Sequence, residues 1–360
     1  MLSKIEFKTC VDFSVKLGLE WSYLADLSAV TIFQSYSWQS IWNESINKNN
    51  LKNSLFIINV YSNKKIIAIL PFERKQSLNF KTLSFTGHPF ADYCDCLIDK
   101  SFFETNPEIK NTIKNYIFNL KNIDLIFFKN ISENNNIYYL FGKYKFKKDS
   151  FCSYQLLRKE ENINDLIKKK FASDTKRQIK RLSLVGRLSY KIANDISDKN
   201  KIFKFFVDNK HKQLADTNNW NYLENNIYKK FLYNLFISNN AHLSSLSLNG
   251  QIIAVHMGNY FKKTMLYLFP VYDNNFSKYS PGNILLYELI KDFFSTGGEE
   301  FDFTTGDESY KIKLSNIKNN MYYQNIELTY KGKIISKILI ILNSFKKINW
   351  LRSTYNKLKY

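Results

Sequence analysis

An internal repeat constrains the fold of this chain more than any other feature. Residues 55–74 (LFIINVYSNKKIIAILPFER) and 242–260 (HLSSLSLNGQIIAVHMGNY) each read as two strands joined by a tight turn. The first turn falls at Ser62–Asn63–Lys64 and the second at Asn249–Gly250, a strong hairpin dipeptide. Both hairpins continue with Ile-Ile-Ala. Self-similarity of this kind predicts one structural unit that occurs twice.

The segments that follow the two hairpins also match. The first hairpin is followed by expected strands at 81–87 and 92–99, a helix over 107–120 and a strand over 123–128. The second is followed by an expected strand over 264–269, a helix over 282–295 and a strand from Glu300. Alternation of helices with hairpins predicts an α/β fold with mixed (α+β) sheets and argues against an all-parallel Rossmann sheet.

The expected domain organisation has three parts. The chain has 360 residues, which is comfortable for two domains. Residues 1–155 form the expected first unit, and residues 156–330 the second, with residues 160–240 mostly helical. Residues 331–360 alternate apolar and basic positions at helical spacing and predict a basic amphipathic helix. Docking of this helix onto the protein is the simpler interpretation, and contact with an anionic membrane surface is the alternative.

The positions of the arginines indicate a binding site more clearly than the net charge does. The formal net charge is +20, but most of it comes from Lys in a chain that is also rich in Asn and Ile, as expected from an AT-rich genome. Arg is rare, and Arg177, Arg181 and Arg187 make up half of the six arginines. The planar guanidinium of Arg can donate two parallel hydrogen bonds to a phosphate or carboxylate, which Lys cannot. This cluster therefore predicts an anion site. No specific nucleic-acid partner is expected, because no RNA- or DNA-binding motif is present.

Cysteine spacing and apolar runs predict neither a metal site nor a targeting segment. The four cysteines are Cys10, Cys94, Cys96 and Cys152, and no Cys/His spacing resembles a zinc site. Reduced thiols are the simplest interpretation. The N-terminus lacks the apolar core of a signal peptide, and no apolar run has the length of a spanning helix. We therefore expect a cytoplasmic protein without a metal cofactor, with peripheral membrane contact left open.

Residues 268–311 carry a resemblance to a known family. The residues that carry it are Tyr272–Asp273, Tyr279–Gly282, Asp302, Gly306–Asp307 and Tyr310–Lys311. This block resembles the GNAT-superfamily acyltransferases of the CelD/BcsL-like family, which are relatives of the Fem-type peptidyl transferases. Weaker matches are Phe33–Trp38, Trp42, Leu70–Phe72, Ala91–Asp99, the basic run Lys176–Arg181 and His211. Leu314 departs from the family pattern, which often has an aromatic residue after the Tyr-Lys pair. The resemblance implies tandem GNAT-like units in a Fem-like architecture.

Ser280, Pro281 and Gly282 open the expected helix and are the candidate donor site. A capping Ser and a first-turn Pro are explained by helix structure alone. The functional interpretation adds the free amides and partial positive charge of a helix N-terminus, which suit a pyrophosphate. In GNAT folds the donor pyrophosphate lies there, so the resemblance implies a site for acetyl-CoA or another acyl-CoA. The candidate donor-binding residues are Ser280, Gly282, Asn283, Arg177 and Arg181.

The candidate catalytic residues lie at or beyond the end of the strand from Glu300. Acyl transfer needs a base for the nucleophile and a donor that faces the developing oxyanion. Asp302 and Asp307 are candidate bases, Lys311 is a candidate oxyanion donor, and His211 is a further candidate base. The structural alternative is an Asp307–Lys311 ion pair at helical spacing. Candidate substrate-binding residues are Tyr272, Tyr310, Asp92 and Asp95.

Three functions remain open from the sequence. The leading hypothesis is an acyltransferase, most simply an N-acetyltransferase, that moves an acyl group from acyl-CoA to an amine or hydroxyl of a small molecule or glycan. Family analogy suggests cell-envelope or polysaccharide biosynthesis. The first alternative is a Fem-like transferase with an aminoacyl-tRNA donor, against which the lack of long helical-arm insertions counts. The second alternative is a non-catalytic GNAT-fold binding scaffold.

Overall fold

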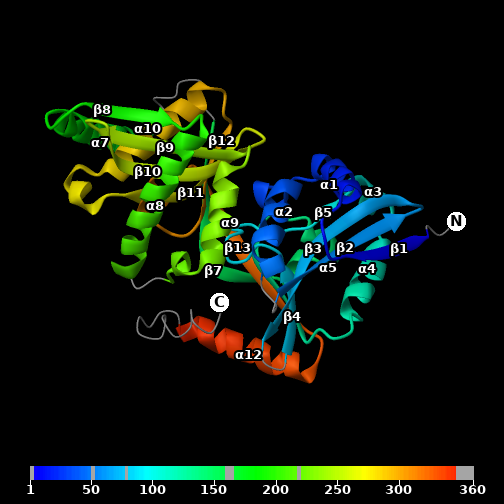
Figure 1. Cartoon of the computed structure of the whole chain (residues 1–360). Coiled ribbons are helices and arrows are strands. Elements are labelled where there is room, and N and C mark those ends of the chain that lie inside the picture. The colour runs from blue at the N-terminus through cyan, green and yellow to red at the C-terminus, as the bar shows by residue number, and fades with distance from the viewer. Residues whose placement is uncertain (1–3, 50–52, 78–79, 159–165, 217–219, 346–360) are drawn as a thin grey trace. The chain divides into compact units, whose positions relative to one another are not determined.

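The chain forms two compact units in a computed structural model (Figure 1). The structure describes residues 4–49, 53–77, 80–158, 166–216 and 220–345. Unit 1 comprises the residues up to Ser150 together with those from Asn320 onward, and unit 2 comprises Phe151–Asn319. Each unit is a mixed α/β structure with its own sheet order.

Unit 1 is a mostly antiparallel sheet covered by helices. Its strands lie in the order β1 (Ile5–Cys10), β2 (Asn53–Ser62), β3 (Lys65–Ser77), β4 (Phe80–Phe85), β6 (Leu125–Ser132) and β13 (Ile317–Glu327), with the short β5 (Leu97–Ile98) beside β3. The β4–β6 pair is parallel. The helices are α1 (Val15–Leu27), α2 (Tyr36–Ser45), α3 (Lys100–Thr105), α4 (Ile109–Phe118), α5 (Ile137–Phe141) and α12 (Tyr330–Phe345). Helix α1 buries Leu17, Trp21 and Leu24 against β2 and β3.

Unit 2 repeats this strand order. Its strands lie in the order β8 (Leu188–Ile192), β9 (Ala241–Leu248), β10 (Gln251–Phe261), β11 (Thr264–Tyr272), β12 (Glu300–Thr305) and β7 (Lys147–Leu157). The β11–β12 pair is parallel, like β4–β6 in unit 1. The helices are α7 (Lys169–Ser183), α8 (Ile196–Asp216), α9 (Asn226–Ile237), α10 (Pro281–Ser295) and α11 (Ser309–Leu314).

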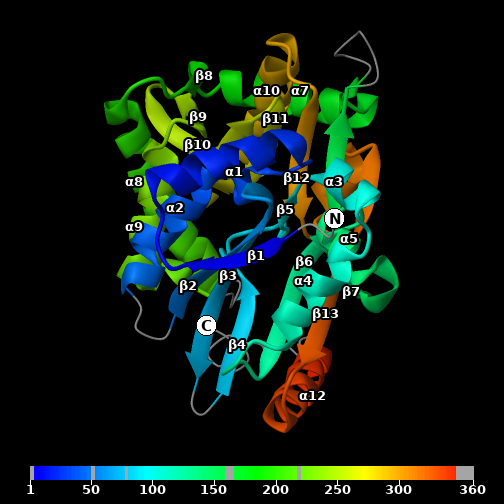
Figure 2. The ribbon, with the colours of Figure 1, turned by 90° about the vertical axis from the view of Figure 1, so that its right-hand side faces the viewer.

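Helices cover both faces of the unit 2 sheet, as Figure 2 shows from the side. On β11, Tyr267 belongs to the core that includes α10, whereas Phe269 contacts Phe206 of α8 and Phe236 of α9. Residues 267 and 269 would normally share a face. A bulge where β10 meets β11 shifts the register and reverses the alternation. The sheet therefore has α10 on one face and α8 and α9 on the other.

Most of the expected elements are present. Both hairpins form, with positive φ at Asn63 (49°) and Lys64 (69°) in one turn and at Asn249 (50°) and Gly250 (82°) in the other. These left-handed residues give the turn a twist that matches the strands. The expected internal repeat and the mixed α/β fold are therefore confirmed.

Two expectations about elements were wrong, and one falls partly outside the described residues. Residues 92–99 do not form a strand beyond Leu97–Ile98, because the Asp95 carboxylate accepts the backbone N–H of Cys96 and so draws the chain out of an extended ladder. Strand β8 was missed within the segment expected to be helical. Of the expected C-terminal helix, α12 is observed, and residues 346–360 lie outside the described residues.

The two units differ in how the chain builds them. Unit 2 is continuous in sequence, whereas unit 1 is completed by residues 320–327 of β13 and by α12, which follow unit 2 in the chain. Residues Met321–Glu327 pair with β6. The domain boundaries at 155/156 and 330/331 stay predictions. Among the described residues, no helix is long and apolar enough to cross a membrane.

Candidate functional site

The start of α10 has an unusual backbone. Ser280 precedes Pro281 in the left-handed region (φ 52°, ψ 52°), a conformation that costs a non-Gly residue on the order of 1 kcal/mol. Its side chain makes no capping hydrogen bond, so the capping role expected for Ser280 is wrong. Its carbonyl instead accepts the N–H groups of Asn283 and Ile284. Because Pro281 has no N–H, Gly282 supplies the first amide of the helix.

Tyr272 packs directly over Gly282. A Cβ atom on Gly282 would lie 3.3 Å from Cδ1 of the Tyr272 ring, which is closer than an ordinary carbon contact. Tyr272 also packs against the apolar cluster that contains Ile284 and Leu285. The two predicted site residues Tyr272 and Gly282 are therefore neighbours, and the glycine keeps the ring against the helix start.

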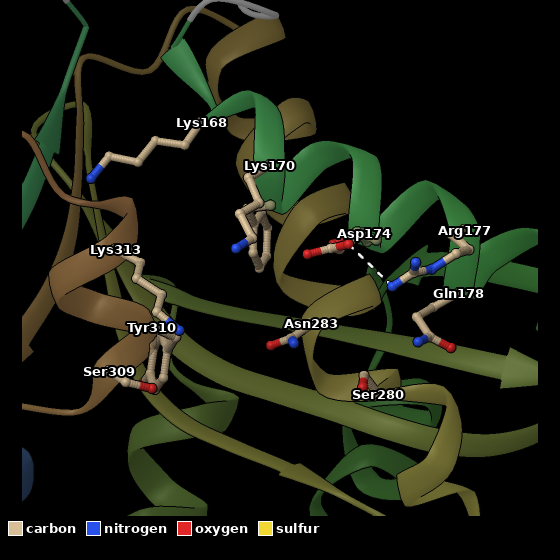
Figure 3. Close-up of a pocket in the computed structure, with 12 residues that line it drawn as sticks. Lys168, Lys170, Asp174, Arg177, Gln178, Ser280, Asn283, Ser309, Tyr310 and Lys313 are labelled. Carbon is tan, nitrogen blue, oxygen red and sulfur yellow. Dashed lines mark hydrogen bonds and ion pairs between the residues drawn. The ribbon is translucent and has the colours of Figure 1, made fainter.

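A pocket of about 610 Å³ lies beside the start of α10 (Figure 3). We call it the basic pocket, and its lining residues are Lys168, Lys170, Phe171, Asp174, Thr175, Arg177, Gln178, Ser280, Asn283, Ser309, Tyr310 and Lys313. Figure 3 shows Asn283 between the α7 side, with Asp174 and Arg177, and the α11 side, with Tyr310 and Lys313. Four cationic side chains and one carboxylate line this volume. The excess of cations suits an anionic ligand.

The two predicted arginines on α7 have different neighbours. Arg177 lines the basic pocket, and its Nη2 lies 3.2 Å from Oδ1 of Asp174. The pair is largely exposed, and exposed pairs contribute about 0–1 kcal/mol, so an anionic ligand can compete for the guanidinium. Arg181 does not line the pocket. It donates to Oε1 of Gln178 and lies 5.6 Å from the ring centroid of Tyr279.

Asp302 and Asp307 lie in different surroundings. Asp302 is 2% exposed, accepts the N–H of Thr304 at 2.6 Å and lies 3.4 Å from Nε2 of Gln155. Asp307 is exposed, and its Oδ1 accepts the hydroxyl of Tyr154 at 2.8 Å. Burial, together with this carboxylate, raises the pKa of Tyr154 to about 12. Neither aspartate lines the basic pocket.

Lys311 pairs with Glu308 rather than with Asp307. Its Nζ lies 3.0 Å from Oε2 of Glu308 and donates to the carbonyl of Thr305 at 2.6 Å. The structural alternative of an Asp307–Lys311 pair is therefore wrong, because Glu308 folds back over Gly306 and takes the place of Asp307. A Cβ on Gly306 would lie 2.5 Å from the Glu308 carboxylate. Lys311 is buried and held by two acceptors outside the basic pocket.

His211 is exposed on α8, where its Nδ1 lies 3.0 Å from Nδ2 of Asn221. Its neighbour Lys210 was not among the predicted site residues, and its Nζ donates to Oε1 of Gln213 at 2.8 Å. Burial lowers the pKa of Lys210 to about 8, against the opposing charge of Glu308. A lysine with a lowered pKa supplies a neutral amine near physiological pH. Nothing in the Lys-His-Lys sequence distinguishes this residue from the many exposed lysines.

Two further histidines were also missed, the buried His256 and the half-buried His242. His256 is 0% exposed and stacks on Tyr267 with a centroid separation of 4.5 Å, and the His242 ring lies 6.2 Å from it. Among the described residues, His256 has no hydrogen-bond partner for either ring nitrogen. Burial lowers the pKa of His242 to about 4 and, together with the nearby His242, holds the pKa of His256 well below its ordinary value. Tyr267 lies 6.1 Å from the ring of Tyr310, which lines the basic pocket, and burial raises the pKa of Tyr310.

Asp92 and Asp95 lie in unit 1 and are not among the residues of the basic pocket. The Asp95 carboxylate accepts the N–H groups of Cys96 (2.8 Å), Asn136 (2.7 Å) and Ile137 (2.9 Å). Burial raises its pKa to about 7 although these three donors oppose the shift. Asp95 therefore holds the start of α5. Asp92 is half-buried in the irregular segment before β5.

The structure brings together five of the predicted residues around the basic pocket and its rim. Ser280, Asn283, Arg177 and Tyr310 line it, and Gly282 lies between two of them. Lys168, Lys170, Asp174, Gln178, Ser309 and Lys313 were missed. The run of lysines at 168–170 was visible, but Lys is too common in this chain to mark a site. In the described part of the chain, no group of three His, Cys, Asp or Glu side chains is arranged to hold a metal ion.

Comparisons with known proteins agree with this geometry. Residues 169–312 match the family model described as "Acetyltransferase (GNAT) domain". No curated protein matches the chain in sequence. The structure of FemX is similar over 95% of this chain and 100% of that chain, with a TM-score of 0.61 and 9% identity. The C-terminal domain of a putative lysylphosphatidylglycerol synthetase from Agrobacterium fabrum covers 90% of this chain and 94% of that one (TM-score 0.53, 10% identity).

A tandem GNAT protein from the clavulanic acid biosynthesis pathway is also similar, over 91% of this chain and 99% of that chain, with a TM-score of 0.50 and 8% identity. At these identities the structures share the fold, which agrees with the repeat of two units described above. The basic pocket lies within the stretch that the family model matches, apart from Lys168 and Lys313 at its edges. Residues 169–312 thus match a GNAT-type acetyltransferase domain, and the fold is similar to that of FemX and of a tandem GNAT protein.

Proposed function

We propose that this protein is an acyltransferase that binds the phosphates of an acyl-CoA donor in the basic pocket of unit 2. The observation that carries the proposal is the meeting of four cationic side chains with the start of α10. A helix N-terminus offers unpaired amides and a partial positive charge, and the lysines and Arg177 add full charges. The volume of about 610 Å³ is within the range of small-molecule sites.

The strand arrangement supports the same reaction. The parallel register of β11 with β12 covers Thr264–Leu266 and Glu300–Asp302, and β11 then continues to Tyr272 beside Gly282. The acyl chain of a donor held at α10 would lie along this part of β11. An amine or hydroxyl of the acceptor attacks the thioester carbonyl, the new C–N or C–O bond forms, and the C–S bond breaks to release the thiol of coenzyme A. The proton of the nucleophile passes to a base.

Residues outside the basic pocket are proposed for that proton transfer. Asp307 and Lys210 are better candidates for the base than Asp302 and Lys311, because Asp307 is an exposed carboxylate and Lys210 has a lowered pKa. Asp302 already accepts a backbone N–H, and Lys311 already serves two acceptors, so we assign them positioning roles. An amine or hydroxyl of a small molecule or glycan is the proposed acceptor. A role in cell-envelope or polysaccharide synthesis rests on the CelD/BcsL-like resemblance, whereas the proposed cytoplasmic location rests on the reduced thiols and the sequence of the N-terminus.

A Fem-like reaction with an aminoacyl-tRNA donor is the second candidate. It is favoured by the fold similarity to FemX and to a putative lysylphosphatidylglycerol synthetase. The basic pocket would then bind RNA phosphates, and binding would weaken steeply with salt. A non-catalytic scaffold ranks third, since it gives no reason for a cationic pocket at an open helix start.

Thermal melting of the purified protein tests the donor. Acetyl-CoA, a longer acyl-CoA, free CoA and aminoacyl-tRNA are added separately, and a ligand that binds only the folded protein raises the midpoint. At 100 times the dissociation constant the stabilisation is about 2.7 kcal/mol. We expect a shift with the CoA compounds. A shift with tRNA alone would favour the Fem-like reaction, and no shift with any of these ligands would rule out both donors.

A further inference from the structure

Helix α12 is seated on unit 1 by one face only. Gly332 lies against β6, since a Cβ on it would be 1.9 Å from the carbonyl oxygen of Asp124. Ile335 and Ser336 are 8% and 1% exposed, and Ser336 Oγ accepts from Nδ2 of Asn325 at 3.1 Å. The Thr329 hydroxyl, just before the helix, donates to Asp124 at 2.7 Å. These contacts fix the rotation of the helix about its own axis.

The opposite face of α12 carries an exposed apolar stripe. Tyr330 is 79% exposed, Ile334 46%, Ile338 48% and Ile341 53%. At 100° per residue these four positions fall within an arc of about 80°, and the centre of that arc lies about 150° from the buried Gly332, Ile335 and Ser336. We call these four residues the α12 stripe. It points away from the residues that seat the helix, so the described part of unit 1 does not cover it (α12 is red in Figures 1 and 2).

Lysines border the α12 stripe on both sides. Lys331 lies on one side, Lys333 and Lys337 lie on the other, and all three are exposed. The sequence from Leu328 to Tyr360 contains no Asp or Glu, and its eight basic residues are Lys331, Lys333, Lys337, Lys346, Lys347, Arg352, Lys357 and Lys359. An apolar stripe between lysines is typical of helices that lie in the interface of a bilayer with anionic lipids.

Helix α1 also has an exposed apolar stripe, but the charges beside it are of both signs. Val15, Leu19 and Leu27 of α1 are 85%, 71% and 44% exposed at helical spacing. The charged positions of α1 are mixed, with Lys16 beside Glu20 and Asp26. An anionic surface would attract the borders of the α12 stripe and partly repel those of α1. A second copy of the chain is a poor occupant of the α12 stripe, because a two-fold interface would bring lysines against lysines.

We propose that the α12 stripe binds the surface of an anionic lipid bilayer, with α12 lying in the plane of the interface. The isoleucines enter the boundary between headgroups and acyl chains, and the lysines contact the anionic headgroups. This inference does not depend on the proposed function of unit 2. It gives the protein a peripheral membrane location through unit 1.

Sedimentation of the full chain with vesicles tests the proposal. Vesicles of phosphatidylcholine alone are compared with vesicles that contain 30% phosphatidylglycerol. We expect binding to the anionic vesicles that exceeds binding to the neutral ones by at least ten-fold. Equal binding to both would overturn the proposal, and so would no binding to either.

Two sets of variants separate the α12 stripe from the general charge of the protein. Ile334→Gln, Ile338→Gln and Ile341→Gln together should lower binding at least ten-fold, whereas Val15→Gln, Leu19→Gln and Leu27→Gln on α1 should leave it unchanged. Lys331→Gln, Lys333→Gln and Lys337→Gln should lower it on the order of 100-fold, about five-fold for each lysine. The exposed lysines Lys16, Lys204 and Lys230 serve as the matched control.

Equal losses in a set and its control would mean that binding follows net charge or general hydrophobicity, which would overturn the assignment to α12. Light scattering gives the oligomeric state of each variant. A change from dimer to monomer in the isoleucine variant, without vesicle binding by the parent protein, would assign the stripe to a second copy instead. A cooperative thermal unfolding transition with the midpoint of the parent protein shows that the α12 variants remain folded.

Discussion

The two units share a strand order, but a different structure follows the fourth strand in each. In unit 2, β11 is followed by α10, one helix of 15 residues that begins with Pro281-Gly282 after a left-handed Ser280. In unit 1, β4 is followed by an irregular segment and two short helices, α3 and α4. Helix α4 begins after Glu108, whose carboxylate would oppose an anion at the helix start. A shared strand order therefore does not create a phosphate site. The site depends on an open helix start with cations around it.

Each unit also contains an ionisable group whose pKa is shifted by burial, and the two shifts have opposite signs. In unit 1 the pKa of the buried Asp95 is raised to about 7. In unit 2 the pKa of the half-buried His242 is lowered to about 4. Both shifts have burial as their largest cause, because burial disfavours the charged form of either group. The contributions of these two groups to stability should consequently change with pH in opposite directions.

The largest expected effect is on acyl-CoA binding at the start of α10, which the start of α4 in unit 1 does not share. Replacement of Gly282 by Leu should disrupt this binding. The side chain would displace the Tyr272 ring, which is 3.3 Å from the ideal Cβ position, and would obstruct the start of α10. We expect the affinity for acyl-CoA to fall by roughly 100-fold, measured by calorimetry or by the melting shift. The matched change Glu108→Leu at the start of α4 should leave the affinity unaltered. A loss with Glu108→Leu would show that unit 1 contributes to the donor site.

Neutralisation of the pocket lysines should have the next largest effect. The triple variant Lys168→Gln, Lys170→Gln and Lys313→Gln should weaken acyl-CoA binding by about ten-fold and flatten its dependence on salt. The fall in affinity is smaller than for Gly282→Leu because the helix start and Arg177 remain. If acyl-CoA binding had the same salt dependence in the parent protein and the variant, these lysines would not contribute to the site. Lys230→Gln, at an exposed position of α9, is the control.

Opposite pH responses of the units are the third prediction. Asp95 has a folded pKa above its unfolded value near 3.9, so its contribution to stability is present below that value and is lost as the pH rises to about 7. His242 has a folded pKa below its unfolded value near 6.5, so its contribution is present above pH 6.5 and is lost as the pH falls to about 4. Each pH unit within a window changes stability by up to about 1.4 kcal/mol.

Hydrogen exchange from pH 4 to 7, corrected for the intrinsic rate and read separately in β6 and β9, measures these responses. Asp95→Asn should remove the pH dependence in unit 1, and His242→Asn should remove it in unit 2. The exposed His211→Asn is the control for the second. Parallel slopes in the two units would contradict the burial-based contrast.

The smallest expected effect concerns the reactivity of two lysines. The pKa of Lys210 in unit 2 is lowered to about 8 by burial, whereas that of Lys65 in unit 1 is raised by hydrogen bonds to Tyr23 and Asp99. At pH 8 about half of Lys210 is neutral, against roughly one part in 250 for an ordinary lysine. We expect acetic anhydride to label Lys210 several-fold faster than Lys65, as measured by mass spectrometry. Slower labelling of Lys210 would contradict a neutral amine at that position.

Local patterns predicted the elements of the fold better than they predicted the site. The Asn249–Gly250 turn and the alternating strands beside it follow from neighbours in the sequence, and so does α10. Strand β8 has only five residues, too few for its alternation to stand out between helices. The segment at 92–99 failed as a strand because Asp95 accepts the amide of the adjacent Cys96 and also those of Asn136 and Ile137, which are more than 40 residues away. No local pattern contains such a contact.

The candidate site was predicted where one segment supplies it and missed where several segments meet. Ser280, Gly282 and Asn283 lie in one motif. Lys168 and Lys313 reach the same pocket from 145 positions apart, and Lys residues occur throughout the chain. Lys210 and the histidine pair owe their pKa shifts to burial, which depends on how α8 and the sheet pack. Those features become visible only when the fold is known.

The position of β13 determines the order in which a growing chain can finish its units. Unit 2 is complete in sequence at Asn319, but β6 of unit 1 lacks its neighbour until residues 321–327 have been synthesised. Until then β6 presents an open strand edge, which is a template for pairing with other chains. Unit 1 is therefore the part that a ribosome-bound chain must protect longest. A fragment that ends at Ser150 should aggregate, whereas addition of β13 and α12 through a linker should restore a soluble unit.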